Sequence, residues 1–158
     1  MELSKDTKIF VTTTSQYTKA GVSVAHRANA SQPLVIDWGD GSADEIDGDV
    51  NNVVHDYGVP GDFVMKMSNL SALSMSSYSS EWRITTSQNL YTIKKCVIGT
   101  TVKQLLNYTF NDLSINSIEI PNSVLSIGSY AFTNVGPIDS IVIPNGVKYV
   151  ATHLFYNN

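Results

Sequence analysis

The sequence predicts a mainly β protein in two parts, a sandwich of short antiparallel strands followed by a short solenoid of repeated units. Charged residues make up only 15% of the chain, whereas Ser, Thr and Asn together number 45. Helical proteins usually carry Glu, Lys and Arg on their exposed faces, so this composition favours strands and turns. The division rests on two patterns, strands separated by turn signals before residue 68 and a repeat of 22–23 residues after residue 90.

Short β-rich segments follow one another through the first 68 residues, and Gly, Pro and Asp turn signals separate them. No sustained helical period interrupts them, and strands at this spacing predict an antiparallel sandwich. Phe63, Met65 and Met67 occupy alternate positions of the last segment, so one face of that strand is expected to be buried. The expected strands cover Lys8–Thr13, Val22–His26, Leu34–Trp38, Val53–His55 and Phe63–Met67.

Three motifs in this half occur in a recognisable order, W-G-D-G at Trp38–Gly41, H-x-Y at His55–Tyr57 and P-G-x-F at Pro60–Phe63. Together they resemble the PKD-type Ig-like domain over about residues 8–68. The resemblance implies a sandwich of about seven strands that serves as a spacer or binding module on extracellular proteins. We expect Trp38 to fill the core between the sheets, and His55 to be a packed, hydrogen-bonded structural histidine.

The second half contains a sequence repeat with a period of 22–23 residues. Ser117–Val124 recurs as Ser140–Val147, and a looser copy begins at Cys96. A period this short predicts a solenoid, because each unit can bury its apolar edge only against its neighbours. Residues at matching positions include Ile98, Ile120 and Ile143; Ile127 and Val150; and Phe110, Phe132 and Phe155.

The repeat reads I-x-I-P-x-x-V-x-x-I-G-x-x-A-F, which resembles the leucine-rich repeats of bacterial surface antigens, the BspA-like repeats. About three repeats cover residues 90–158, and the resemblance implies ligand or host-surface binding without catalysis. The expected organisation is a PKD-like sandwich over 1–68, a connecting or N-terminal capping segment over 69–89, and the leucine-rich-repeat solenoid over 90–158. The middle segment is too apolar for a free tether, which favours a cap; it contains Leu70, Leu73, Met75, Tyr78, Trp82 and Ile84.

A calcium site is the one metal site that the sequence suggests. Asp47–Asn51 resembles the start of an EF-hand loop, but that pattern continues with Gly and ends with Glu, where this chain has Asn52 and Gly58. Asp37, Asp40 and Asp44 could add oxygen ligands. We expect solvated, turn-capping carboxylates and no other cofactor. The calcium candidates that remain are Asp40, Asp47, Asp49 and Asn51.

No catalytic motif is present, neither HExxH, GxSxG, a P-loop nor a paired-cysteine pattern. We therefore predict that the protein is not an enzyme. Cys96 aligns with Ile118 and Ile141, so its expected role is that of a buried hydrophobic residue. His26 and His153 have no predicted partner.

The charge distribution limits the partners. The formal net charge is −4, and eight of the 14 acidic residues lie between Asp37 and Asp62, where no Lys or Arg occurs. This argues against nucleic acid and against polybasic attachment to membranes. Exposed tyrosines make good recognition residues, and a protein or glycan surface is the expected ligand. The binding candidates are Tyr108, Tyr130, Tyr149 and Tyr156.

The expected function is structural recognition outside a cell. The first 30 residues hold no apolar run longer than Ile9–Val11, whereas a secretory signal needs about 7–15 apolar residues. Both resembled families usually occur outside cells. A phage virion component, in a tail, a fibre or a capsid decoration, would reach that location without a secretory signal, because virions assemble inside the cell and leave by lysis. It would bind a bacterial surface or another virion protein. The alternatives are a fragment of a bacterial cell-surface adhesin and a carbohydrate-binding accessory module of an enzyme.

Assembly with other chains is also expected. The last repeat carries Val147, Val150 and Phe155 but no evident cap, and soluble monomers rarely leave such an apolar edge bare. We therefore expect residues 140–158 to be covered by another copy or by a different subunit, as a homo-oligomer or as part of a larger assembly.

Overall fold

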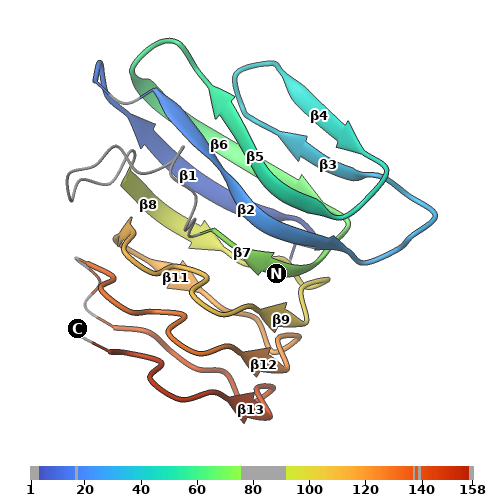
Figure 1. Ribbon diagram of the computed structural model, residues 1–158, viewed down its shortest axis with the longest axis vertical. Coiled ribbons are helices and arrows are strands. Elements are labelled where there is room, and N and C mark those ends of the chain that lie inside the picture. The colour runs from blue at the N-terminus through green and yellow to red at the C-terminus, as the bar shows by residue number, and fades with distance from the viewer. Residues whose placement is uncertain (1–3, 17, 76–91, 137, 139, 157–158) are drawn as a thin grey trace.

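The computed structural model describes residues 4–16, 18–75, 92–136, 138 and 140–156, and every regular element among them is a β-strand (Figure 1). This confirms the mainly β class. Within this part of the chain, no helix is long and apolar enough to cross a membrane.

The strands of the first half are long and those of the repeats are short. The first seven are β1 (Thr7–Thr13), β2 (Lys19–Arg27), β3 (Leu34–Asp37), β4 (Ala43–Ile46), β5 (Val50–Asp56), β6 (Gly61–Ser68) and β7 (Leu70–Ser74). The remaining ones are β8 (Thr92–Val97), β9 (Gln104–Leu105), β10 (Ser114–Ile115), β11 (Ile118–Glu119), β12 (Ser126–Ile127) and β13 (Tyr149–Val150).

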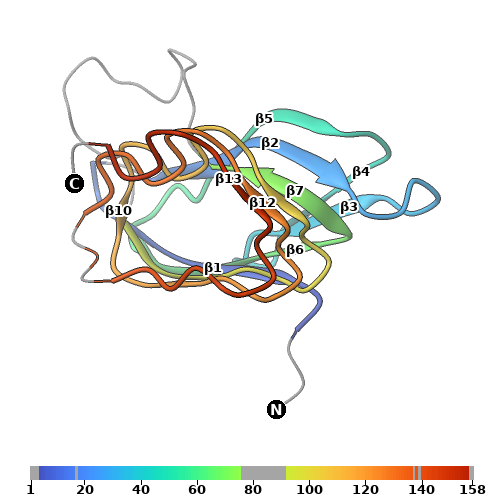
Figure 2. The ribbon, with the colours of Figure 1, turned by 90° about the horizontal axis from the view of Figure 1, so that it is seen from below.

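Two sheets run through both halves of the chain. The first has the order β10-β8-β1-β6-β3-β4, with β11 also on β8, and the second has the order β13-β12-β9-β7-β2-β5. Figure 2 shows them as two layers, with β2, β7 and β12 in one and β1 and β6 in the other. In Figure 1 the repeats lie one below the next beneath β7 and β8.

Strands β7 and β8 join the two halves. β8 is antiparallel to β1 but parallel to β10 and β11, and β7 is antiparallel to β2 but parallel to β9. The register shifts between Phe10 and Val11 in one junction and between His26 and Arg27 in the other. Such irregularities increase the local twist of a strand, and here they lie where antiparallel pairing gives way to parallel pairing.

Strand β7 lies in the segment that the sequence assigned to a connector or cap. Its Leu70 and Leu73, and the adjacent Met75, are fully buried, so this part of the segment is packed in the core. Tyr78, Trp82 and Ile84 lie outside the described residues.

The register of the parallel strands confirms the repeat period. Leu105 lies opposite Ile127, Ile127 opposite Val150, and Ile118 opposite Cys96. We number the units from these matches as the first (96–117), second (118–140) and third (141–156). Backbone hydrogen bonds also connect them outside the strands, as from the Phe110 N–H to the Ala131 carbonyl at 2.8 Å.

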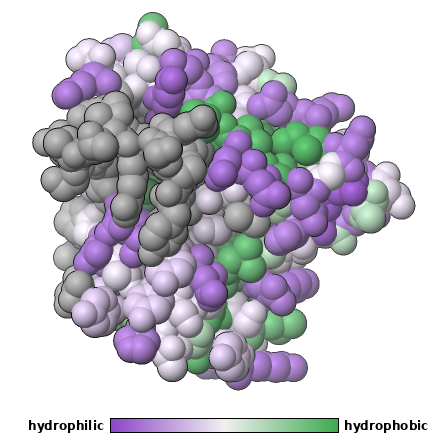
Figure 3. Space-filling model, in the orientation of Figure 1, coloured by the Kyte–Doolittle hydropathy of each residue, from purple (hydrophilic) through white to green (hydrophobic). Residues whose placement is uncertain are grey.

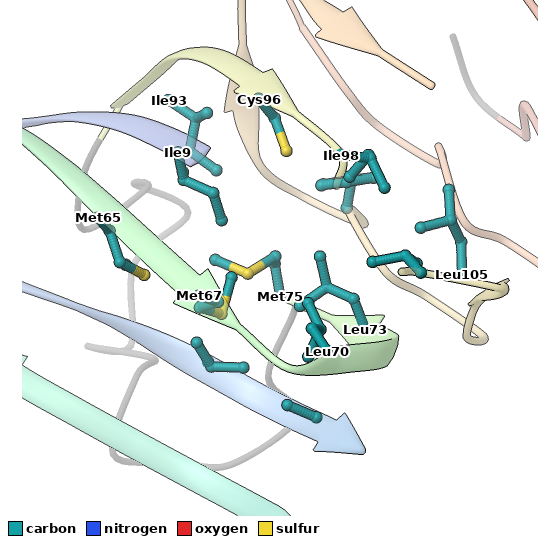
Figure 4. Close-up of a cluster of buried hydrophobic side chains, with 14 of the residues drawn as sticks. Ile9, Met65, Met67, Leu70, Leu73, Met75, Ile93, Cys96, Ile98 and Leu105 are labelled. Carbon is teal, nitrogen blue, oxygen red and sulfur yellow. The ribbon is translucent and has the colours of Figure 1, made fainter. Parts of the chain in front are cut away.

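One apolar core extends through both halves. It includes Trp38, which is 1% exposed as expected, and the fully buried Cys96. Figure 4 shows Ile9 of β1, Met67 of β6 and Cys96 of β8 in the same cluster of side chains, together with residues from β7. The first half therefore supplies part of the surface against which the first repeat unit is buried.

Burial decreases toward the third unit. Phe110 and Phe132 are fully buried and stack with their ring centroids 5.6 Å apart, whereas Phe155, stacked 5.5 Å beyond Phe132, is 45% exposed. Ile98 is buried, while Ile120 and Ile143 are half-buried and pack against the core. The third unit is exposed in this way because, among the described residues, it has a neighbouring unit on one side only.

The phenylalanine column gives a graded test of this arrangement. Phe132→Ala should lower the free energy of unfolding by about 3–5 kcal/mol, because a fully buried ring is replaced by a cavity. Phe155→Ala should lower the free energy of unfolding clearly less, since Phe155 is already 45% exposed to solvent. Urea unfolding followed by circular dichroism measures both losses. Equal losses at the two positions would contradict the gradient.

Candidate functional site

The Asp40 carboxylate is held firmly in the turn after β3. Its Oδ1 accepts hydrogen bonds from the Ser42 hydroxyl at 2.6 Å and the Ser42 N–H at 2.9 Å, and the His55 Nε2 lies 2.7 Å from its Oδ2. These bonds, the Ser42 pair first and then His55, hold the pKa of Asp40 well below its ordinary value. A carboxylate satisfied in this way acts as a structural part of the turn.

His55 is packed and hydrogen-bonded, as the sequence predicted. Its ring stacks on Trp38 at 4.8 Å and meets the edge of Tyr57 at 4.6 Å. The Tyr57 hydroxyl in turn donates to the Trp38 carbonyl oxygen at 3.0 Å. The W-G-D-G and H-x-Y motifs therefore form one polar and aromatic cluster.

The structure gives each calcium candidate a separate environment. Asp49 accepts a hydrogen bond from the Arg27 N–H at 3.0 Å and lies 2.8 Å from the His26 Nδ1, so the expectation that His26 has no partner is wrong. Asp47 and Asn51 are exposed. Among the described residues, no group of three or more His, Cys, Asp or Glu side chains is placed to hold a metal ion. The turn-capping role of these carboxylates stays the prediction, with calcium binding as its alternative.

Cys96 has the environment of a core residue. It is fully buried, and burial raises the pKa of its thiol to about 12. A thiol with so high a pKa stays neutral near pH 7, and the thiolate is the form that attacks substrates or binds metals. The predicted hydrophobic role of Cys96 is confirmed.

Tyr108 and Tyr130, two of the binding candidates, form an aromatic ladder with His153. Tyr108 stacks on Tyr130 at 5.1 Å, and Tyr130 stacks on His153 at 5.0 Å. All three residues have positive φ values, between 58° and 60°. A bulky residue rarely adopts this backbone conformation, so the stacked rings and the bonds between units hold it in place. His153, expected to stand alone, is therefore the third member of a repeated position.

The other two candidates are more exposed. Tyr156 is 53% exposed and presents its ring edge-on to Tyr130 and His153, with centroid distances of 6.2 and 6.1 Å. Tyr149 is 64% exposed on β13. Tyr108, Tyr130 and Tyr156 therefore lie in or beside the ladder, whereas Tyr149 lies on the exposed face of the second sheet.

A groove crosses the exposed face of the parallel strands β9, β12 and β13. We call it the β12 groove; it has a volume of about 560 Å³. Its floor follows the register of the sheet, in which Ser126 lies between Gln104 and Tyr149. The lining residues are Ser74, Gln104, Leu105, Leu106, Asn107, Ser126, Ile127, Gly128, Ser129, Tyr149 and Ala151.

The polar side chains of the β12 groove are positioned by alternation along each strand. Leu105 and Ile127 point into the core, being 1% and 0% exposed, so their neighbours Gln104 and Ser126 face outward. In the adjoining turns, the Asn107 Oδ1 accepts a hydrogen bond from the Ser129 N–H at 2.9 Å, which fixes the amide plane. The sequence analysis named Tyr149 but not the other polar residues of the groove. Gln104 and Ser126 could have been located as the residues that directly precede the inward-facing Leu105 and Ile127.

Over the described residues, the groove lining carries no formal charge and combines polar side chains with apolar ones such as Leu106 and Ala151. In Figure 3, the lower part of the molecule, where the repeats lie, shows pale, weakly polar atoms together with green and purple ones. Such a surface can exchange hydrogen bonds with a ligand but offers no group suited to general acid–base or metal chemistry.

A family model described as a BspA type leucine rich repeat region matches residues 65–158, in six copies. The match covers more than half of the chain and begins within β6. No curated protein and no solved structure matches the chain.

The low pKa of Asp40 should make the free energy of unfolding depend on pH in acid. Because the folded state holds this carboxylate ionised, the unfolded state takes up the proton first, and the stabilisation is lost as the pH falls below about 4. Asp40→Asn should therefore be less stable than the parent near pH 7, and the difference should shrink toward about pH 3. Urea unfolding across that range measures it, with the exposed Asp47→Asn as the matched control. A difference independent of pH would contradict the assignment.

Proposed function

The chain belongs to the BspA-type leucine-rich repeat family, and from this premise we propose that it is a non-enzymatic recognition protein that binds its partner through the β12 groove. Repeats of this family are recognition modules found on surface and extracellular proteins. The observation that carries the proposal is the groove itself, a row of outward-facing amide, hydroxyl and phenol groups on β9, β12 and β13.

We propose further that residues 8–68 are a PKD-type Ig-like sandwich that carries the repeats, and that the repeats form a short solenoid of about three units. The cluster of Trp38, Asp40, His55 and Tyr57 supports the first assignment, because it uses the motifs on which the resemblance rests. The parallel register of β9, β12 and β13 supports the second.

The setting we propose is a phage virion, where the protein would be a tail, fibre or capsid-decoration component that contacts a bacterial envelope. The alternatives are a bacterial adhesin and an accessory module of a carbohydrate-active enzyme. All three would use the β12 groove in the same way. Mass spectrometry of purified virions, compared with that of bacterial cell-wall fractions, distinguishes the first two settings.

Binding to whole cells tests the proposed function. The labelled chain, incubated with a panel of bacterial strains, should bind at least one strain, and Ser126→Arg should abolish that binding by filling the groove. Val142→Arg is the matched control, since it adds the same charge at a site that is 77% exposed and does not line the groove. Flow cytometry measures the bound fraction. Equal binding by both variants, or no binding to any strain, would refute recognition through the groove.

We also propose that the third repeat unit is covered by a second copy of the chain. Its Val150 and Phe155 are each 45% exposed, whereas the matching Ile127 and Phe132 of the second unit are fully buried, and large exposed apolar surfaces mark interaction sites. Light scattering should show self-association that increases with concentration and that Val150→Ser with Phe155→Ser abolishes. Leu125→Ser, at a side chain that is 42% exposed in the second unit, should have no effect. A parent chain that stays monomeric at high concentration would contradict the proposal.

A further inference from the structure

The chemistry of the β12 groove specifies its ligand more closely than the family does. Among the described residues that line it, none carries a formal charge. The acidic side chains gather instead in the first half, on Asp37–Asp62. A charged partner placed in the groove would therefore lose hydration without gaining an opposite charge. The groove favours a neutral ligand.

The backbone beneath the groove is already hydrogen-bonded. β12 pairs with β9 on one side and β13 on the other, and β9 pairs also with β7. An extended peptide that binds by strand addition needs unpaired main-chain groups at a sheet edge, and the interior of this sheet face provides none. Among the apolar lining residues, Leu105 and Ile127 are at most 1% exposed, whereas Leu106 and Ala151 are half-buried and leave a small apolar surface in the groove. Directional recognition in the interior of this face therefore comes from the polar side chains, beside that small apolar surface.

Those side chains form rows that recur from one unit to the next. Gln104, Ser126 and Tyr149 are in register across three strands, and Asn107 and Ser129 form a second row joined by their own hydrogen bond. Amides and hydroxyls both donate and accept hydrogen bonds, as sugar hydroxyls do. Tyr149, 64% exposed at one end of the first row, offers an aromatic surface on which the C–H face of a sugar ring can pack.

We propose that the β12 groove binds a neutral oligosaccharide, with its hydroxyls on Gln104, Asn107, Ser126 and Ser129 and one sugar ring on Tyr149. This rests on the proposed function, because it names the ligand class for the same groove. The repeated rows suit a ligand with repeated polar groups, which is why a chain of several sugars fits better than a single one.

The first test treats the cells that the chain binds. Periodate oxidation of the cell surface, which cleaves sugar diols, should abolish binding, whereas digestion with proteinase K should leave it unchanged. Binding that depends on Ser126 but is lost to the protease and survives periodate would overturn the oligosaccharide proposal and leave the proposed function standing. Failure to bind any strain would overturn both.

The second test uses defined ligands. Isothermal titration with hexasaccharides of glucose, mannose and N-acetylglucosamine should show binding of at least one, and none of the anionic hexagalacturonate. Gln104→Ala and Tyr149→Ala should each weaken that binding about tenfold, the loss expected for a central contact residue. Val142→Ala, which truncates a side chain that is 77% exposed and lies outside the groove, is the matched control and should leave it unchanged. Binding of the anionic sugar alone, or equal losses in all three variants, would overturn the proposal.

Discussion

The pairing of β7 and β8 with the first half of the chain is the interaction on which the rest of the structure depends. A repeat of 22–23 residues cannot bury its apolar edge alone, and two-residue strands such as β9 and β12 have little stability of their own. β8 pairs with β1, and β7 pairs with β2, so the first unit begins on strands that already pair with those of the first half. Each later unit then pairs with the one before it, and burial declines with distance from this support, from Phe110 to Phe155.

The core and the proposed recognition surface use alternate residues of the same strands. Leu105 and Ile127 face the core, while Gln104 and Ser126 face solvent. Substitutions at the outward positions can therefore change the ligand without disturbing the column of buried side chains. The ladder of Tyr108, Tyr130 and His153 contributes to stability, because each ring stacks on the ring of the next unit. Residue type alone suggested Tyr108 and Tyr130 as binding residues, and that role stays a prediction beside their structural one.

Local patterns were readable from the sequence, and long-range pairings were not. The buried Trp38, the hydrogen-bonded His55, the buried Cys96 and the repeat register all follow from motifs or from a fixed period. The partner of His26 in β2, by contrast, is Asp49, which lies 23 residues away in sequence, in the turn between β4 and β5. The continuity of both sheets through β7 and β8 could not be predicted, because strand alternation fixes which face is buried but not which strand lies alongside. The β12 groove was missed for a similar reason, since Ser and Gln are common on every exposed strand and gain meaning only when the units are aligned.

The first repeat departs from the repeat pattern at a position where it contacts the first half of the chain. Where the second and third units have Pro121 and Pro144, the first has Gly99. The Gly99 N–H donates to the Thr7 hydroxyl at 3.0 Å, a bond that proline cannot make because it lacks the N–H. A Cβ at Gly99 would also lie only 2.6 Å from the Asp6 carbonyl carbon and 2.7 Å from the Thr7 nitrogen, so even alanine would push the chain before β1 away. The departure from the repeat pattern at this position is thus required by the contact with the first half, and the degeneracy of the first unit records the surface on which the later units are built.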